Sequence, residues 1–531
     1  MTSYVKLEKV NIFENRNRKK GVLMDPQNTR ANTLARTRII AGISLILGIL
    51  FDYFFYDKIP GISFPLYVIL IIAGLFIITK LDKGKINKEV FFLLVLLIFF
   101  STMVFVRSSG LLTFLNIIAT LILLLIITQI SFGYKIKNFA FKDYIKIFFL
   151  PFKFIPSSFQ TLSSLFSQQE TKEERKVFPQ IVQGILMAIP VLFVFLLLFS
   201  SADLIFQKVV TNFFNIDNTL EVFLRFILIL IVTVIFVGAY AYSFRAKSSQ
   251  TSKQQNIKNY TIGKIENSIL LGSVNFLFFV FILVQFTYLF GGESNISAQG
   301  FTYAEYARRG FFELIAVAII SLLLLLVIEK YVIKEKTGHV LGFKILSTAL
   351  VIQVMLIMVS AFTRLSLYEQ AYGFTVLRFY SHAFIILLAI IFCLLLYKIH
   401  QDRQENTFAL RAFSVIILFI VVMNFLNPDA FIARRNIERF EVTGKLDLSY
   451  LSQLSDDAVP VIIELLNISN EEIRKSVAHE LYWHAQENDS LYFSKWQSFN
   501  LSQMRANKIL NSEIQELEPY KDYQQQTFNS Q

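Results

Sequence analysis

Three short polar segments stand out because they combine arginine, glutamate and tyrosine beside long apolar runs. They cover residues 301–314, 364–378 and 427–439. The planar guanidinium of arginine donates two parallel hydrogen bonds, which suits carboxylate and phosphate groups. The segments could therefore bind an anion, with glutamates as orienting partners of the arginines. The candidate ligand-binding residues are Glu305, Arg309, Glu313, Arg364, Tyr368, Glu369, Tyr372 and Arg378.

The first segment has the spacing of a helix start. Thr302 and Glu305 stand three residues apart, as in a capping box. Glu305, Arg309 and Glu313 then follow at i, i+4 and i+8, so they share one stripe of alternating charge. We expect this helix to run on into the apolar residues that follow, with Glu313 in the first turns inside the membrane.

The second and third segments carry similar signals. Ser366 and Glu369 repeat the capping-box spacing, and Gly373 suits a helix end, so we expect a short helix lying at the surface. Asn427 followed by Pro428 predicts the start of another helix. That helix would place Arg434, Arg435 and Arg439 close to the last apolar run.

The elements that position these segments are apolar runs of membrane-spanning length. The chain has 531 residues, of which 54% are hydrophobic and 17% charged. About 20 apolar residues in a helix cross the roughly 30 Å of hydrocarbon in a bilayer. About eleven such spans are predicted, with ten to twelve as the range. They are 38–56, 62–79, 89–106, 110–130, 181–202, 222–244, 267–290, 310–333, 343–362, 382–400 and 408–425.

Lysine and arginine crowd every second loop between these spans. The basic side includes residues 1–37, 80–88, 135–176, 245–264 and 330–336, whereas each opposite loop holds only one or two cations. The positive-inside rule then places the N-terminus in the cytoplasm. An odd number of spans places the residues after about 426 on the extracytoplasmic side.

The sequence predicts an all-α, polytopic helical membrane protein with a small helical C-terminal tail. Its expected parts are a basic cytoplasmic segment (1–37), a four-helix membrane region (38–130), an interfacial segment with a linker (131–180), a seven-helix membrane core (181–426) and an acidic tail (427–531). In the tail, two amphipathic helices are expected at Tyr450–Leu466 and Glu471–His484, followed by a disordered end.

Several function classes find no support in the sequence. The net charge of +12 flanks the apolar spans instead of forming a basic domain, which argues against nucleic acid as a partner. His479 and His484 are five residues apart, about 140° around a helix, so they do not form a zinc-protease helix. No phosphate loop or dinucleotide fingerprint is present. We therefore predict no catalytic residue, no metal and no cofactor.

Polar residues inside the spans have a simpler interpretation. Asn116, Asn275, Gln285 and Gln353 are expected to make hydrogen bonds between helices. Glu329, near the inner end of its span, is expected to extend to water.

Three stretches resemble a bacterial multi-pass membrane family catalogued only as a domain of unknown function, number forty-one seventy-three. They are YAEYARRGFFEL, RLSLYEQAYGFTVLR and ARRNIERFEVTGKLDLSYLSQLSDDAVP, and the resemblance covers roughly residues 180–470. It implies a polytopic protein of the bacterial cytoplasmic membrane and carries over no catalytic residue.

Two interpretations of the polar segments remain open. In one, the glutamates cap helices, the arginines pair with them and the tyrosines lie at the interface. In the other, the segments converge on an outer pocket that binds or transports an anionic, lipid-like or envelope-derived ligand. The alternatives are a membrane enzyme acting on a lipid-linked substrate, with Glu313, Glu369 or Asp429 as acid or base, and an envelope scaffold or sensor. The oligomeric state stays open.

Overall fold

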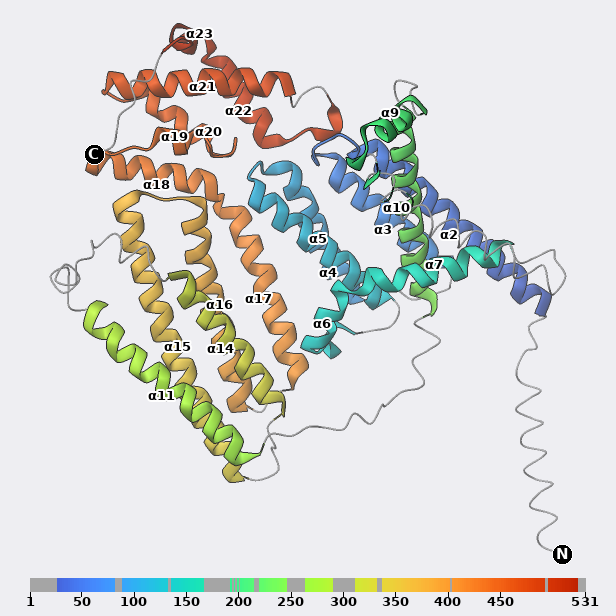
Figure 1. Cartoon of the computed structure of the whole chain (residues 1–531), viewed down its shortest axis with the longest axis horizontal. Helices are drawn as coiled ribbons and strands as arrows, with labels where there is room; N and C mark the ends of the chain where they lie inside the picture. The colour runs from blue at the N-terminus through green and yellow to red at the C-terminus, as the bar shows by residue number, and fades with distance from the viewer. Residues whose placement is uncertain are drawn as a thin grey trace, which may run out of the picture. The chain divides into compact units, whose positions relative to one another are not determined.

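The computed structural model describes residues 26–81, 88–131, 135–166, 201–213, 219–245, 263–289, 311–331, 337–401, 404–491 and 495–523, with four positions between 192 and 199. All regular structure in these ranges is helical (Figure 1). The helices are α2 (Pro26–Phe55), α3 (Ser63–Leu81), α4 (Lys88–Val106), α5 (Gly110–Ser131), η1 (Ile136–Asn138), α6 (Phe141–Phe148), α7 (Leu150–Phe166), α9 (Leu204–Phe213), α10 (Thr219–Arg245), α11 (Lys264–Leu289), α14 (Phe311–Tyr331), α15 (Thr337–Tyr372), α16 (Val376–Gln401), α17 (Glu405–Leu426), α18 (Pro428–Thr443), α19 (Leu448–Leu451), α20 (Val459–Ile462), η3 (Ile463–Asn467), α21 (Glu471–Leu491), η4 (Trp496–Ser498), α22 (Leu501–Ser512), α23 (Ile514–Leu517) and η5 (Glu518–Tyr520).

Ten helices of the described chain are long and apolar enough to cross a membrane. They lie in α2–α5, α10, α11 and α14–α17, and each coincides with a predicted span. Most of the remaining predicted span, 181–202, falls outside the described residues. The all-α, multi-pass membrane architecture is thereby confirmed.

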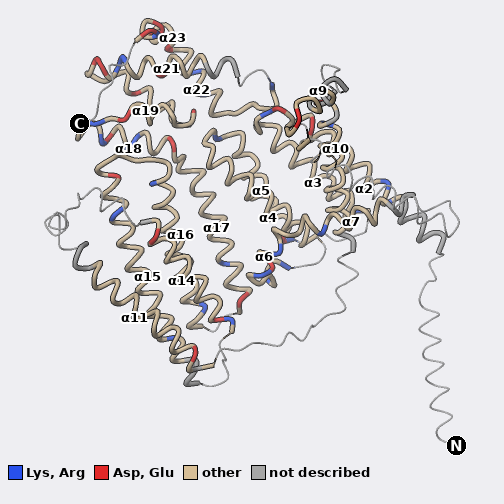
Figure 2. Tube along the Cα trace, viewed as in Figure 1, with Lys and Arg blue, Asp and Glu red and all other residues tan. Residues whose placement is uncertain are grey.

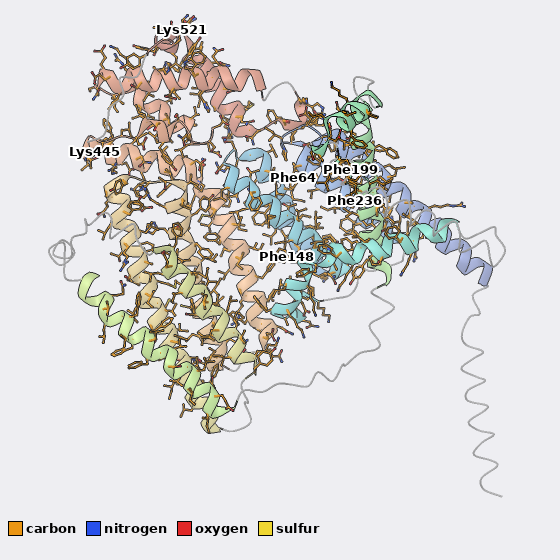
Figure 3. The ribbon with its side chains drawn as sticks, viewed as in Figure 1. Phe64, Phe148, Phe199, Phe236, Lys445 and Lys521 are labelled. Atoms are coloured by element: carbon orange, nitrogen blue, oxygen red, sulfur yellow. The ribbon has the colours of Figure 1, made fainter. Side chains whose placement is uncertain are left out.

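Residues 141–166 do not form a span but two helices, α6 and α7. Phe141, Phe148, Phe149 and Phe152 are exposed, with Phe148 at 62% (Figure 3), whereas Phe154 is buried. An exposed aromatic row next to lysines is typical of a segment in the membrane interface. That position stays a prediction.

The chain divides into two compact units. The first contains residues 1–53, 70–85 and 151–246. Inside it, the Arg225 guanidinium pairs with the Asp52 carboxylate at 2.7 Å, and the Tyr240 hydroxyl donates to the Ile71 carbonyl at 3.0 Å. These contacts join α10 to α2 and α3.

The second unit contains residues 54–69, 86–150 and 247–531, and it carries all three polar segments. Its buried side chains include Leu271, Ala318, Leu325, Leu350, Val354 and Phe392. Because lipid is as apolar as these side chains, the helices associate through close packing and polar contacts. Charged residues gather toward the ends of α14–α17 (Figure 2). We call the end of this bundle that adjoins α18 the tail end.

Polar side chains inside the spans link neighbouring helices, as predicted. Asn116 and Asn424 exchange two amide hydrogen bonds of 2.9 and 2.8 Å between α5 and α17. The Asn275 amide of α11 donates to the Leu346 carbonyl of α15 at 3.1 Å. The Gln353 amide donates back to the Asn275 carbonyl at 3.1 Å. In lipid such bonds replace water as the partner of each amide.

The tail has its own apolar core, which includes Leu451, Val459, Leu465, Val477, Leu481 and Leu510. The predicted helix Glu471–His484 is confirmed as α21. The predicted helix Tyr450–Leu466 is wrong, because the chain there forms α19, a turn, α20 and η3. The turn exists because Asp456 and Asp457 leave the helix to bind other segments, and Pro460 restarts it. Helices α22 and α23 were not predicted. The last residues were predicted to be disordered, and those after 523 lie outside the described residues.

A buried polar contact, here called the tail junction, joins the tail to the turn between α4 and α5. The Asp457 carboxylate accepts from the backbone of Ser108 at 2.9 Å, from the Ser502 hydroxyl at 2.9 Å and from the Arg107 guanidinium at 3.2 Å. Arg107 also donates to the Asn424 carbonyl at the end of α17. The carboxylate lies at the N-terminus of α5, where the helix dipole favours an anion.

A second carboxylate, Asp429, is buried beside the junction. It accepts from the Ser455 hydroxyl at 2.5 Å and from the Ser109 hydroxyl at 3.3 Å. Burial raises the pKa of Asp429 above its usual value, and the hydrogen bonds from Ser455 and Ser109 only partly oppose the shift. Asp457 adds to the rise through charge repulsion.

This shift predicts a pH dependence of stability. A carboxyl whose pKa is higher in the folded state stabilises the fold below the unfolded pKa, about 3.9, and loses that contribution as pH rises through the folded pKa. The Asp429→Asn variant lacks this titration, and its amide oxygen can still accept from the Ser455 hydroxyl. We expect wild type to gain thermal stability relative to Asp429→Asn as pH falls from 7 toward 4. A constant difference between the two melting curves across that range would contradict the assignment.

Candidate functional site

Residues 364–372 of the second polar segment belong to α15, which continues without interruption to Tyr372. The predicted short surface helix is therefore wrong. A capping box requires a residue outside the helix at its first position. Ser366 is instead inside the helix, and its hydroxyl donates to the Phe362 carbonyl one turn earlier at 3.0 Å. The predicted helix end is confirmed, since Gly373 has a φ of +82° and its N–H donates to the Glu369 carbonyl at 2.8 Å.

Arg364 lies on α15 about two turns before the helix ends, and only 6% of its surface is exposed. Its guanidinium donates to the Gln285 side-chain oxygen of α11. The same oxygen accepts from the Ser360 hydroxyl at 3.3 Å. Ser360 precedes Arg364 by one turn, so both face α11. We call these three residues the Arg364 group.

Glu369 and His382 join α15 to α16 close by. Their Oε1 and Nδ1 atoms are 3.1 Å apart, and the side chains are 7% and 13% exposed. The other ring nitrogen, Nε2, lies 3.1 Å from the Ser366 hydroxyl and 3.3 Å from the Phe362 carbonyl. We call Glu369 and His382 the acid–imidazole pair.

The order serine, imidazole, carboxylate resembles a catalytic triad, but the hydrogen bonds run the wrong way. A carbonyl oxygen can only accept, so the contact with Phe362 requires a proton on Nε2. Ser366 donates its own proton to the same carbonyl. In the tautomer with a proton on Nε2, His382 cannot act as the base that activates Ser366.

Arg378 lies in the first turn of α16 and reaches back over the end of α15. Its Nη1 donates to the Gly373 carbonyl, and its guanidinium stacks 4.0 Å from the centre of the Tyr368 ring. The Tyr368 and Tyr372 rings are 5.0 Å apart, and Tyr372 is 57% exposed. A guanidinium has five donors, so Arg378 can hold this position and still present an edge to a ligand.

The third segment forms α18, whose start at Pro428 is confirmed. Asn436 on α18 clamps the turn after α15, since its side chain exchanges hydrogen bonds of 2.8 and 2.9 Å with the Phe374 backbone. Arg439 donates to the Gln370 and Ala371 carbonyls at the end of α15. Arg435 pairs with Glu438 at the surface. In this segment the structural interpretation holds for Arg435 and Arg439.

The eight predicted site residues therefore have different outcomes. Arg364, Tyr368, Glu369, Tyr372 and Arg378 lie together at the tail end of α15 and α16. Glu313 is exposed in the first turn of α14. Glu305 and Arg309 lie outside the described residues. The sequence did not identify His382, although one ionisable side chain in the outer turns of a span is itself a signal of function.

A second buried pair lies at the opposite end of the bundle. The Lys398 ammonium of α16 is 2.5 Å from the Glu329 carboxylate of α14, and the side chains are 3% and 8% exposed. Lys398 also lies 5.4 Å from the centre of the Phe408 ring. The expectation that Glu329 extends to water is therefore wrong, because Lys398 supplies its counter-charge inside the protein.

The two tail histidines have separate partners. His479 contacts the Tyr520 carbonyl through Nδ1 at 2.9 Å. His484 contacts the Asp456 carboxylate through Nε2 at 2.9 Å. The imidazole rings of His479 and His484 therefore both form contacts within the tail.

One protein family matches this chain. Its description is "Domain of unknown function (DUF4153)", and it matches residues 94–465, well over half of the chain. The resemblance to a family of unknown function is confirmed, with the number 4153 in place of forty-one seventy-three, and the match begins at α4, earlier than expected. It includes the Arg364 group, the acid–imidazole pair and most of the tail junction. No curated protein and no solved structure matches the chain.

Proposed function

The chain belongs to the DUF4153 family, whose description assigns no activity, and we propose its function from the site alone. We propose that it binds an anionic amphiphile, a molecule with a phosphate or carboxylate head and an apolar tail, at the tail end of α11, α15 and α16. The observation that carries the proposal is the buried guanidinium of Arg364, which Gln285 holds in a fixed orientation.

The chemistry of the site favours such a head group. A buried arginine in a membrane-spanning helix marks a functional site by default, because a charge at that depth is expensive. Gln285 is a neutral side chain that accepts from the Arg364 guanidinium and orients it. Arg378 adds a second guanidinium, stacked on Tyr368. Two arginine forks suit the oxygens of one phosphate or carboxylate.

The surroundings favour an apolar tail on the same ligand. Phe362 and Val359, on the same stretch of α15, are 38% and 59% exposed. Tyr368 and Tyr372 suit the level of lipid head groups, where aromatic side chains with one polar end concentrate. A lipid-like molecule could thus place its head at the arginines and its chain along α15.

The orientation of the site follows from charge. Lysines of the second unit crowd the end opposite the tail, including Lys88, Lys135, Lys137, Lys330 and Lys344. The positive-inside rule then places the tail end outside the bacterial cytoplasmic membrane. On this proposal the ligand is derived from the envelope or the outer leaflet.

A second candidate function is a scaffold or sensor. The tail supports it, since the tail has its own apolar core and a built contact with the α4–α5 turn. Deletion of residues 440–531 separates the two proposals. If the protein is a scaffold or sensor, this deletion should abolish its function. If α11, α15 and α16 form a ligand site, the shortened protein should still bind the anionic amphiphile.

The ligand site can be tested with dodecyl phosphate as the probe and the full chain in dodecyl maltoside micelles. We expect Arg364→Gln to weaken binding by about 10–100-fold, because hydrogen bonds to a charged group contribute about 1.5–3 kcal/mol. Isothermal titration calorimetry measures the change. Arg364→Lys keeps the positive charge but lacks the planar guanidinium, so its affinity for the probe should lie between those of wild type and Arg364→Gln.

Arg435→Gln is the matched control, since it removes the same charge from an exposed position on α18. It should leave the affinity within about twofold. Equal weakening by Arg435→Gln and Arg364→Gln would indicate general charge attraction and overturn the proposal. Melting curves of each variant show whether it is folded.

A further inference from the structure

The acid–imidazole pair is the strongest feature that anion binding leaves unexplained. Glu369 and His382 are mostly buried, come from different helices and lie at the end of α15 that also carries Arg364. Buried ionisable groups inside a membrane unit are expensive and tend to mark ion or proton pathways. The hydrogen bonds around the pair reveal where its protons lie.

The first proton is on Nε2 of His382. This atom faces the Phe362 carbonyl at 3.3 Å, and a carbonyl oxygen has no proton to donate. It also faces the Ser366 hydroxyl at 3.1 Å, and that hydroxyl gives its proton to Phe362. Both neighbours therefore accept from Nε2.

The second proton lies between Nδ1 and the Glu369 carboxyl. An ionised carboxylate can only accept, and an unprotonated Nδ1 can only accept, so their 3.1 Å contact requires one proton. The pair is either imidazolium with carboxylate or imidazole with carboxylic acid. Both forms contain the same number of protons, and both are neutral overall.

We propose that the Glu369–His382 pair is a proton-binding site, and that proton uptake there is coupled to anion binding at Arg364. The coupling rests on the proposed function, whereas the proton site does not. Loss of one proton would leave the Glu369 carboxylate facing the Nδ1 lone pair or, with the remaining ring proton on Nδ1, the Phe362 carbonyl facing the Nε2 lone pair. That repulsion would weaken the link between α15 and α16.

The charges around the pair set the sign of the coupling. Toward the tail end, the ionisable side chains of the described chain on α15, α16, α14 and α18 are, besides the pair, Arg364, Tyr368, Tyr372, Arg378, Tyr380, Glu313, Asp429, Arg434, Arg435, Glu438, Arg439 and Glu441. The cations disfavour an additional proton. Arg364 is five residues from Glu369, a rise of about 7.5 Å along the helix. An anion bound at Arg364 offsets its charge and favours the proton, so anion and proton should bind together.

The proton site can be measured without any ligand. The full chain, labelled with ¹⁵N in its five histidines, is placed in lipid nanodiscs, and His382→Gln assigns the signal. We expect both ring nitrogens of His382 to bear protons or to share one with Glu369 at pH 7. In Glu369→Gln, Nδ1 should become an unprotonated acceptor. A wild-type ring with its only proton on Nδ1, or an unprotonated Nδ1 whose signal is the same in Glu369→Gln, would overturn the proton site.

Two variants serve as controls for this measurement. Glu313→Gln makes the same chemical change on an exposed residue of α14 and should leave the His382 signal unchanged. Ser366→Ala removes a neighbour of Nε2 and should preserve the Nδ1 proton. Because Ser366→Ala leaves both members of the pair in place, it tests the assignment even if Glu369→Gln does not fold.

The coupling is measured with dodecyl phosphate in buffers of different ionisation enthalpy. At the pH at which the ¹⁵N signal shows the unliganded pair losing its shared proton, we expect up to one proton to be taken up per probe, with binding up to about tenfold tighter per unit decrease in pH. Glu369→Gln should abolish the uptake. Probe binding without uptake would overturn the coupling. Absence of probe binding would refute the proposed function and the coupling, and leave the proton site to stand on the ¹⁵N result.

Discussion

Replacing Lys398 with methionine should lower the free energy of unfolding by about 3–5 kcal/mol, the usual effect of removing one partner from a buried ion pair. Lys398 and Glu329 are 2.5 Å apart and less than a tenth exposed. Without Lys398, Glu329 must keep its charge in an apolar bundle or take up a proton. Protonation of an ordinary glutamate at pH 7 costs about 3.7 kcal/mol, which agrees with that range.

The double variant Glu329→Met/Lys398→Met should recover most of this loss. Apolar residues of similar volume often replace a buried ion pair without cost. The four proteins of the double-mutant cycle are compared by unfolding in mixed micelles with increasing dodecyl sulfate. A coupling energy near zero, with the two single losses adding in the double variant, would show that the pair acts as two separate residues.

The membrane spans could be predicted because hydropathy is summed over about 20 residues. An error of a few residues at either end leaves the sum almost unchanged. Helix α15 shows the limit of the method, since hydropathy predicts only 343–362 of the 36 residues from Thr337 to Tyr372. The polar turns of α15 remain helical because Arg364 and Glu369 find partners on α11 and α16.

Short-range signals failed where a distant segment supplied a stronger partner. Ser366 and Glu369 have the spacing of a helix start, yet Glu369 turns to His382 on the next helix. Asp457 stands in a stretch with helical periodicity, yet its carboxylate binds the turn at Ser108, about 350 residues earlier. Spacing along the chain contains no information about such partners.

In the candidate site too, single residues could be predicted from the sequence, whereas their partners on other helices could not. The sequence identified Arg364 and Glu369 as unusual, but Gln285 and His382 could not be assigned to them. Successive side chains of a helix point 100° apart around its axis, so which residues of two helices meet depends on how each helix is rotated about its own axis. Packing of the whole bundle sets that rotation.

Asp457→Ala should loosen the tail from the membrane bundle. This carboxylate accepts from the Arg107 guanidinium, the Ser108 backbone and the Ser502 hydroxyl, so its loss affects two separate segments, the α4–α5 turn and α22. Its side chain is 3% exposed and that of Arg107 is 19% exposed. The loss of a buried partner in such a network lowers stability by about 3–5 kcal/mol. Trypsin should then cut the tail of the nanodisc-embedded protein faster than in wild type.

Asp457→Asn removes the negative charge at this position but keeps nearly the same side-chain size and shape. Its one side-chain oxygen can still accept from Ser108, but its amide cannot accept from Arg107, so we expect an intermediate effect. Asp447→Ala is the matched control, because Asp447 caps α19 within the tail and contacts Tyr450 and Ser449. Its removal should leave the attachment to the α4–α5 turn intact. Equal acceleration of cleavage by Asp447→Ala and Asp457→Ala would mean that general destabilisation of the tail, and not the tail junction, governs access of the protease.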